Sequence, residues 1–378
     1  MIKEPNTLTA MEAAASISSG SLSSVDLVQS CLDQISKTDG QIKAWEYIDG
    51  ENALEQAAEC DRIRRHGKST GPLHGVPVGL KDIIDTVDMP TQLGSSVFKG
   101  RQTTKDARIV ERLRESGAVI LGKTVTTELA FLHPSKTRNP HDLDRTPGGS
   151  SSGSAAAVAA DLCVGATGTD TGGSIRQPAS FCGVVGIKPT YGLCSRWGIA
   201  AFASSLDQAG VFTRTAEDSA ILLTHISGFD PKDSTSSKNP VPDYAADCVK
   251  KFKSLTIGIP SEFLDGLDDK VREVFDENIR ILEKNGCKFK KISLKSSKLG
   301  VSAYQVVAPA ECSSNLSRYD GVRFGYRAKN VKDIEELYKK SRSDAFGSEV
   351  KRRILIGTYA LSAGYYDAYY LKAQKVRK

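Results

Sequence analysis

Short runs of apolar residues alternate with segments that carry apolar residues at helical spacing. From position 76 to position 167 this pattern predicts strands at 76–80, 118–121 and 163–167, separated by helices at 106–116 and 154–160. Strands that are apolar at nearly every position are buried on both faces, as in sheets covered by helices. The alternation therefore predicts an α/β fold.

The same alternation continues on both sides of this block, where the sequence predicts helices and strands at 8–36, 53–65, 255–259, 268–283 and 287–294. Within 8–36 we expect two helices separated by Gly20. A polar stretch at 230–253 contains Pro and Ser and interrupts the alternation. Because the pattern resumes after it, we interpret this stretch as a surface excursion and expect one domain over residues 1–378.

Composition narrows the class of protein. Hydrophobic residues make up 39% and charged residues 25% of the 378 residues, which is ordinary for a globular protein. The net charge of +6 is small and both signs are interspersed, so we expect no direct binding to nucleic acid. The eight cysteines form no C-x-x-C pair and no metal-ligand spacing, which favours reduced thiols in a cytoplasmic protein and argues against a bound metal. We also expect no cofactor in this chain. Without an apolar signal segment or a run of 18 apolar residues, we expect no membrane interaction.

Two clusters of Gly and Ser, at 147–154 and 168–176, flank a short alanine-rich helix. Glycine allows the main chain to approach a ligand closely, so these clusters indicate a site rather than a scaffold. The stretch Thr171–Ser174 places consecutive backbone N–H groups beside a hydroxyl. Acyl-transfer enzymes use such an arrangement to stabilise an oxyanion next to the nucleophile, so Ser174 is the candidate nucleophile.

A serine hydroxyl needs a base to take up its proton. None of the five histidines stands near an Asp in a context that indicates a Ser-His-Asp triad. Lys81 is the better candidate, because it ends the apolar strand that follows Gly75 and can be drawn out of water there. Burial favours the neutral amine, which can act as a base.

These motifs resemble the amidase signature family. The residues that carry the resemblance are Gly148-Gly149-Ser150-Ser151-Ser152-Gly153-Ser154, the stretch from Gly168 to Arg176, and Lys81. Members of that family use a Ser-Ser-Lys triad to hydrolyse amides. The resemblance extends along nearly the whole chain and implies the amidase-signature fold, with a central mixed β-sheet covered by helices on both faces.

The same resemblance implies a role for each matching residue. Ser174 corresponds to the acylated nucleophile, Ser150 to a bridging serine that follows a cis peptide bond, and Lys81 to the base. The interval between the two serines matches the family's interval. The backbone N–H groups of an oxyanion hole are implied at Thr171, Gly172, Gly173 and Ser174.

Two other stretches of the sequence match known catalytic or binding motifs in their residue pattern alone. Gly117–Thr124 fits G-x-x-x-x-G-K-[ST], but its variable positions are continuously apolar and predict a buried strand instead of a phosphate-binding loop. Gly149–Gly153 fits G-x-S-x-G with Ser151 at the centre, but an α/β-hydrolase needs an Asp or Glu and then a His further along. The only later histidine is His225, within a predicted apolar helix at 216–226, so we reject both motifs.

The part of the chain from Tyr304 to Lys378 closely resembles one branch of the family, the A subunit of the aspartyl/glutamyl-tRNA amidotransferase. The resemblance implies a glutaminase that releases ammonia for the transamidation of misacylated tRNA, with B and C subunits as partners and with ATP and Mg used by a partner subunit. It also implies that Tyr304 and Arg353 hold glutamine, with Arg353 as a planar fork for the α-carboxylate. In the alternative interpretation, Arg353 is a surface residue in a basic run with Lys351 and Arg352.

The chain departs from this branch in two respects. Residues 128–142 look closer to stand-alone amidases. The family also continues well past a position like Lys378, through another core strand and an acidic residue that contacts the substrate ammonium, so we expect the chain to lack the C-terminal part of the family fold. Three functions stay open: a glutaminase subunit, a stand-alone amidase for a small or aryl carboxamide, and a catalytically inactive assembly subunit.

Overall fold

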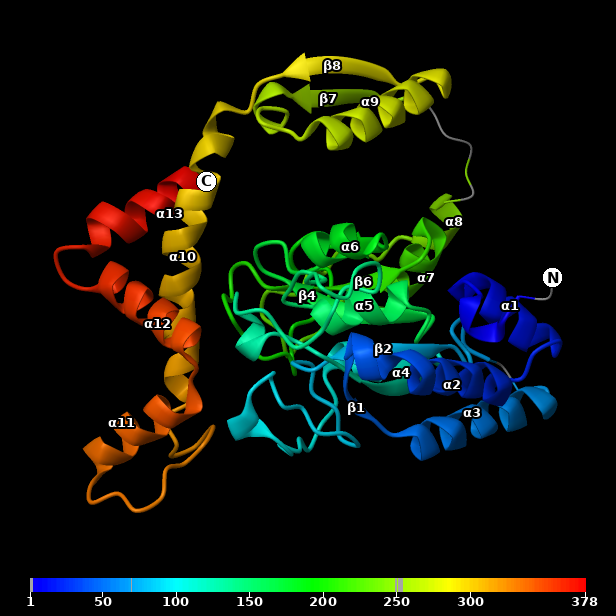
Figure 1. The fold of residues 1–378 in the computed structure, drawn as a ribbon, viewed down its shortest axis with the longest axis horizontal. Helices are drawn as coiled ribbons and strands as arrows, with labels where there is room; N and C mark the ends of the chain where they lie inside the picture. Colours follow the sequence, from blue (N-terminus) through cyan, green and yellow to red (C-terminus); the bar gives the residue numbers. More distant parts are fainter. Residues whose placement is uncertain (1–2, 69, 249, 251–253) are drawn as a thin grey trace. The chain divides into compact units, whose positions relative to one another are not determined.

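The computed structural model describes residues 3–68, 70–248, 250 and 254–378 (Figure 1). The chain forms two compact units. The first contains Met1–Cys248 and Glu311–Leu355, and the second contains Val249–Ala310 and Ile356–Lys378. Two compact units can still unfold together, so one domain over residues 1–378 stays a prediction.

A mixed six-stranded sheet forms the centre of the first unit. Its strands are β1 Trp45–Ile48, β2 Pro77–Lys81, β3 Val119–Thr124, β4 Gly165–Asp170, β5 Val185–Ile187 and β6 Gln208–Thr213. They lie in the order β1-β3-β2-β4-β6-β5, in which β2 is parallel to β3 and to β4 and the other pairs are antiparallel. The predicted α/β fold with a mixed sheet is confirmed.

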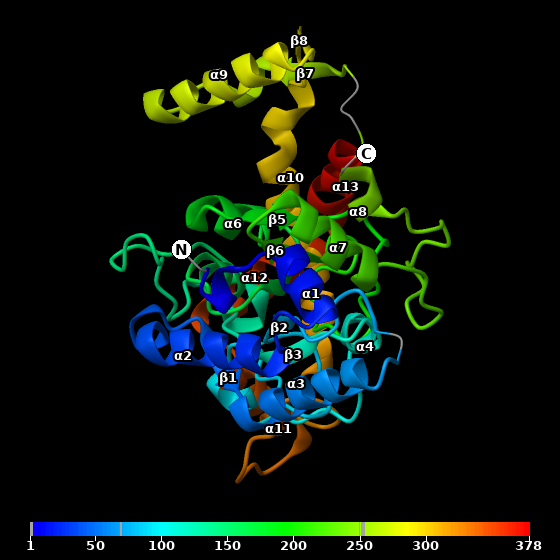
Figure 2. The same ribbon diagram turned by 90° about the vertical axis from the view of Figure 1, so that its right-hand side faces the viewer.

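The helices of the first unit are α1 Ala10–Ser19, α2 Ser24–Ile42, α3 Gly50–Arg65, α4 Arg108–Glu115, α5 Ser152–Ala159, α6 Arg176–Cys182, α7 Ala216–Ile226, α8 Tyr244–Cys248 and α11 Ile334–Ala345, with most of α12 Ser348–Leu361. Helices α2 and α3 lie side by side (Figure 1, Figure 2). The predicted break at Gly20 is confirmed: Gly20 ends α1 with a left-handed φ of 80° that favours glycine.

Helices cover both faces of the sheet. Ala166 of β4 belongs to a buried apolar cluster with residues of α2, α3, α5 and α6. At the preceding position, Gly165, an added Cβ would meet Leu222 of α7. Because successive strand residues point to opposite faces, α7 covers the face opposite to α5.

The second unit contains a small β-α-β arrangement. Strands β7 Thr256–Pro260 and β8 Lys288–Ile292 pair in parallel, and α9 Asp269–Lys284 lies between them in sequence. These bounds agree with the predicted strand, helix and strand. The unit also holds the first part of α10 Gly300–Asn315 and α13 Lys372–Arg377. Of the predicted polar excursion at 230–253, positions 249 and 251–253 lie outside the described residues.

Helix α5 packs unusually closely against the ends of two strands, because it consists of small residues. Residues 152–158 are all buried. A Cβ added at Gly153 would lie 2.2 Å from the carbonyl oxygen of Ala44 and 2.3 Å from the amide nitrogen of Val125. This close approach fixes the position of the segment 149–152, which leads into the helix.

We predict that Gly153→Ala destabilises the protein by about 1–3 kcal/mol, since the methyl group has no room and the backbone must shift. Gly40→Ala is the matched control, because Gly40 lies exposed in α2 with nothing within 4 Å of an added Cβ. That change should stabilise the helix by about 0.5–1 kcal/mol. Urea unfolding of both variants measures the difference, and equal stabilities would contradict this account of the packing.

Candidate active site

A buried lysine connects two segments at the carboxyl edge of the parallel strands. Lys81 is the last residue of β2, and its side chain is fully buried. Its Nζ donates one hydrogen bond of 2.7 Å to Ser150 Oγ and another of 2.7 Å to Thr169 Oγ1 in β4. Since β2 and β4 run parallel, their ends meet at one edge of the sheet, and the segment before α5 brings Ser150 to the same point.

Burial gives this amine the properties of a base. It lowers the pKa of Lys81 from its ordinary 10.5 to about 7, while the carboxylates of Asp170 and Asp207 act in the opposite direction. Desolvation penalises the ammonium form, because the interior cannot replace its hydration. A large fraction of Lys81 is therefore neutral near pH 7 and able to accept a proton through the hydroxyl that it contacts.

The glycine-rich turn after β4 lies against the Ser150 segment. The amide of Ser151 donates a hydrogen bond of 3.3 Å to the carbonyl oxygen of Ser174. The Gly149–Ser150 peptide bond is cis. Ser174 itself is half-buried and stands just before α6. The structure thus brings the segments of Lys81, Ser150 and Ser174 together at one place.

Asp170 organises this turn. Its carboxylate accepts hydrogen bonds from the amides of Gly173 (2.8 Å) and Ile175 (3.1 Å), and a two-pronged contact from the Arg176 guanidinium (3.0 Å each). Burial acts to raise the pKa of Asp170, but the bonds from Arg176 and from the backbone outweigh it and hold the pKa below its usual value. The anionic carboxylate is therefore stable in this position.

This contact changes the expected set of oxyanion donors. The Gly173 N–H points to Asp170, so it is not free to face a substrate in this structure. Among the described residues, the amides of Thr171, Gly172 and Ser174 make no hydrogen bond. Three of the four expected donors therefore remain unengaged, and their part in an oxyanion hole stays a prediction.

Sequence reasoning did not identify three polar residues of this region. Thr169 and Asp170 lie inside the quoted glycine-rich motif, where two polar residues at the end of a buried strand could have pointed to them. Asp207 precedes β6 and accepts a hydrogen bond of 2.6 Å from Thr171 Oγ1. No local pattern distinguishes Asp207 from other acidic residues, because its partner lies far away in the sequence.

The two rejected motifs have structural roles. Lys123 lies in β3, fully buried, where its Nζ is 3.5 Å from Asp82 Oδ1 and donates to Thr91 Oγ1 (2.7 Å). The strand predicted in place of a phosphate-binding loop is confirmed.

Ser151, the centre of the second rejected motif, is fully buried and donates a hydrogen bond to the carbonyl oxygen of Thr169 (3.2 Å), so it is not an exposed nucleophile. His225 is half-buried in α7.

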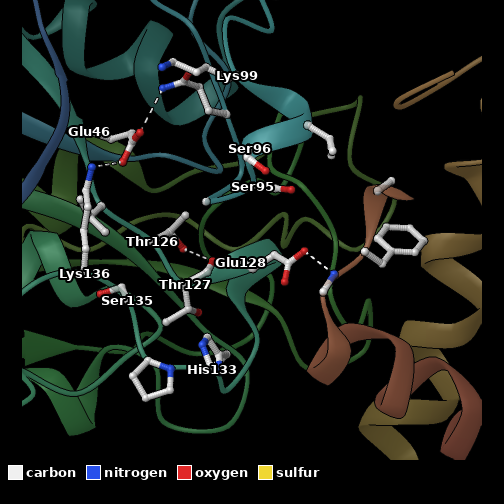
Figure 3. Close-up of a pocket in the computed structure, with 18 of the residues that line it drawn as sticks. Glu46, Ser95, Ser96, Lys99, Thr126, Thr127, Glu128, His133, Ser135 and Lys136 are labelled. Atoms are coloured by element: carbon white, nitrogen blue, oxygen red, sulfur yellow. Dashed lines mark hydrogen bonds and ion pairs between the residues drawn. The ribbon is translucent and has the colours of Figure 1, made fainter. Parts of the chain in front are cut away.

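An open pocket of about 600 Å³ lies next to the Ser150 segment (Figure 3). Thr127 lines the pocket, and its amide donates a hydrogen bond of 3.1 Å to the carbonyl oxygen of Ser150. On one wall Glu46 and Lys136 point toward each other and form an ion pair of 2.7 Å (Figure 3). Neither Lys81 nor Ser174 lines the pocket, so it adjoins the buried lysine instead of containing it.

The pocket wall includes part of the stretch for which the sequence predicts a likeness to stand-alone amidases. Glu128 and residues 133–136 belong to the predicted segment 128–142. Glu128 Oε1 accepts a hydrogen bond of 2.9 Å from the amide of Gly347, directly before α12 (Figure 3). This segment therefore both lines the pocket and contacts the residue before α12.

Arg353 is largely buried. Its Nε donates a hydrogen bond of 2.7 Å to Glu349 Oε1, and its side chain is 15% exposed, in contrast to 64% for Arg352. Burial raises the pKa of the nearby Cys312 thiol to about 12, with Arg353 lowering it and Asp207 raising it. Arg353 and Asp207 therefore both lie within electrostatic reach of Cys312. Tyr304 belongs to the second unit, so its role stays a prediction.

All eight cysteines are free thiols. Within residues 3–68, 70–248, 250 and 254–378, no cluster of His, Cys, Asp or Glu could hold a metal ion. None of the helices in these ranges is long and apolar enough to cross a membrane.

Comparison with known proteins agrees with this geometry. The sequence model of the family described as Amidase matches residues 26–378. The chain is 51% identical to the A subunit of the glutamyl-tRNA(Gln) amidotransferase of Thioalkalivibrio sulfidiphilus, an alignment that covers 98% of this chain and 78% of the relative. The corresponding protein of Carboxydothermus hydrogenoformans is 49% identical with the same coverage.

Two solved structures are similar in fold. The A subunit of the glutamyl-tRNA(Gln) amidotransferase of Thermotoga maritima has a TM-score of 0.78 at 38% identity, covering 100% of this chain and 75% of that one. The peptide amidase of Stenotrophomonas maltophilia has a TM-score of 0.83 at 32% identity, covering 98% of this chain and 78% of that one.

We predict that the Lys81 amine titrates with a midpoint of about 7, because burial makes the ammonium form costly. Its ¹⁵Nζ resonance, assigned by its absence in Lys81→Met, should report a charged group below that pH and a neutral one above it. Lys123 is an internal comparison, since burial lowers its pKa only to about 8. A Lys81 midpoint near the ordinary 10.5 would contradict this assignment of a neutral amine.

Proposed function

The chain belongs to the amidase family, and we propose that it hydrolyses glutamine as the A subunit of a glutamyl-tRNA(Gln) amidotransferase. The observation that carries an amide-hydrolysing function is the buried contact of Lys81 with Ser150, beside a turn that presents free amides and a serine. The relatives at about half identity carry the name of this subunit of the amidotransferase.

We assign the chemical steps as follows. Neutral Lys81 accepts a proton through the hydroxyl of Ser150, and Ser174 attacks the carbonyl carbon of the amide. The amides of Thr171, Gly172 and Ser174 stabilise the oxyanion that forms. The proton then returns through Ser150 to the leaving nitrogen, which departs as ammonia and leaves an acyl-enzyme. Water hydrolyses the acyl-enzyme, with Lys81 and Ser150 again moving the proton.

We assign the recognition of glutamine to Arg353 and Tyr304. A guanidinium binds a carboxylate with two parallel hydrogen bonds, which fits the α-carboxylate of an amino acid. The low exposure of Arg353 supports this assignment, because a solvated basic face would leave its side chain in water. In the proposed assembly, B and C subunits take up the ammonia, and a partner subunit uses ATP and Mg to activate misacylated tRNA. A cytoplasmic location stays a prediction.

The second candidate is a stand-alone amidase for a small or aryl carboxamide. It is favoured by the pocket wall that residues 128–142 contribute and by the similarity to a peptide amidase. In that case the substrate would enter the pocket beside Thr127 and would present no carboxylate to Arg353.

We predict that Ser174→Ala, Ser150→Ala and Lys81→Met each reduce ammonia release by at least about 10²–10⁴-fold, because each variant interrupts the proton path or removes the nucleophile. Ser180→Ala is the matched control, since Ser180 is an exposed serine on α6 beyond the turn. Ammonia is measured with glutamine and with a neutral carboxamide as substrates. A fully active Ser174→Ala variant would refute the assignment of the nucleophile.

We predict that Arg353→Ala raises KM for glutamine about tenfold or more while the rate with an uncharged amide stays unchanged, because only glutamine presents a carboxylate to the guanidinium. Arg352→Ala on the same helix should affect neither substrate, since this side chain is exposed. If Arg353→Ala leaves glutamine hydrolysis intact and the neutral amide is the better substrate, the stand-alone amidase is the correct alternative.

A further inference from the structure

Asp207 is a buried carboxylate in contact with the glycine-rich turn. Its side chain is 7% exposed. It accepts hydrogen bonds from Thr171 Oγ1 (2.6 Å), from the amide of Phe202 (2.8 Å) and from the amide of Ala203 (3.0 Å to each oxygen). Burial raises the pKa of Asp207, and these hydrogen bonds oppose the rise. Every one of the partners is a donor to Asp207, which is the pattern of an ionised carboxylate.

The loop that carries Asp207 is itself held in place. Glu311 accepts hydrogen bonds from both the amide (2.9 Å) and the hydroxyl of Ser205. Asn315 donates to the carbonyl oxygen of Phe202 (3.1 Å). Both residues lie in the part of α10 that belongs to the first unit. Because these hydrogen bonds hold the loop, Asp207 can fix the side chain of Thr171 instead of following it.

Asp207 is also a charge near the buried amine. It lines a narrow interior cavity together with Thr169, the hydrogen-bond partner of Lys81, and with Thr171. Among the residues that the structure describes, the only other carboxylate that acts on Lys81 is Asp170, and the Arg176 guanidinium pairs with that group. Among the described residues no Lys or Arg forms an ion pair with Asp207, although Arg196, which pairs with Asp233, lines the same cavity and acts to lower the pKa of Asp207. The negative charge of Asp207 is therefore less fully compensated by nearby cations than that of Asp170.

We propose that Asp207 is a positioning residue of the amidase site: it holds Thr171, and with it the oxyanion turn, and it keeps a negative charge opposite Lys81. This inference rests on the proposed function. Glu311 and Asn315 connect the loop 202–207 to the first-unit part of α10. The turn, this loop and these two residues therefore form one network of hydrogen bonds.

The two roles of Asp207 make separate predictions. Asp207→Asn removes the negative charge. It also places the side-chain NH2 group of Asn, a hydrogen-bond donor, against one of two other donors, the hydroxyl of Thr171 or the amide of Phe202. We expect kcat to fall about 10–100-fold, as for the disturbance of an oxyanion hole. With the negative charge gone, the ammonium form of Lys81 is less favoured. The acidic limb of the kcat/KM profile, near pH 7 in the wild type, should then move to lower pH by about 0.5–1 unit.

Thr171→Val separates these effects, because it removes the hydroxyl and keeps the charge. We expect kcat to fall with the acidic limb unmoved, and Thr171→Ser to restore the rate. Asp218→Asn is the matched control: Asp218 is a buried carboxylate that accepts a hydrogen bond of 3.0 Å from the amide of Met11, but it contacts neither Thr171 nor Lys81. It should change neither the rate nor the pH profile.

Each result decides a part of the inference. An Asp207→Asn variant that folds and keeps the wild-type acidic limb overturns the electrostatic role, and a Thr171→Val variant with wild-type kcat overturns the positioning role. A wild-type chain that hydrolyses no amide refutes the proposed function. In that case the ¹⁵Nζ titration of Lys81 in wild type and Asp207→Asn still tests the charge, since it requires no turnover. If Asp207→Asn does not fold, Thr171→Val and Thr171→Ser decide the inference alone.

Discussion

The removal of one amine from water is the constraint on which the site depends. Lys81 has no access to solvent, and the two hydroxyls of Ser150 and Thr169 replace only part of its hydration. An ammonium ion in such surroundings is costly, so the fold must either neutralise the amine or supply negative charge nearby. The structure does both in part, because Asp170 and Asp207 oppose the effect of burial without cancelling it.

The neighbouring buried pair shows a different solution to the same problem. Lys123 is equally inaccessible, but Asp82 lies 3.5 Å away and the carbonyl oxygen of Ile84 accepts a hydrogen bond of 2.8 Å. Its pKa stays higher, at about 8, and burial raises the pKa of Asp82 to about 6. Two lysines on adjacent strands therefore differ because one has a direct counter-ion and the other faces hydroxyls.

The local pattern of the sequence was sufficient to predict those features of the fold that depend on residues close together in the chain. The apolar strand that ends at Lys81, the helix break at Gly20 and the strand at Lys123 follow from periodicity and from glycine conformation. Strand β1 and the role of Asp207 were missed, because both depend on partners far away in the chain. The engagement of Gly173 by Asp170 was also missed: a run of glycines indicates free amides but does not show which one an adjacent carboxylate takes.

The hydrogen bond between Glu128 and Gly347 links two regions that are implied to select the substrate. Glu128 belongs to the pocket wall, and Gly347 directly precedes the helix that carries Arg353. A Cβ at position 347 would lie 2.3 Å from the Glu128 carboxylate, so the Glu128 side chain would have to move to make room for it. Positions 347 and 128 are therefore coupled: a side chain at 347 requires the Glu128 carboxylate to leave its place beside the 347 amide.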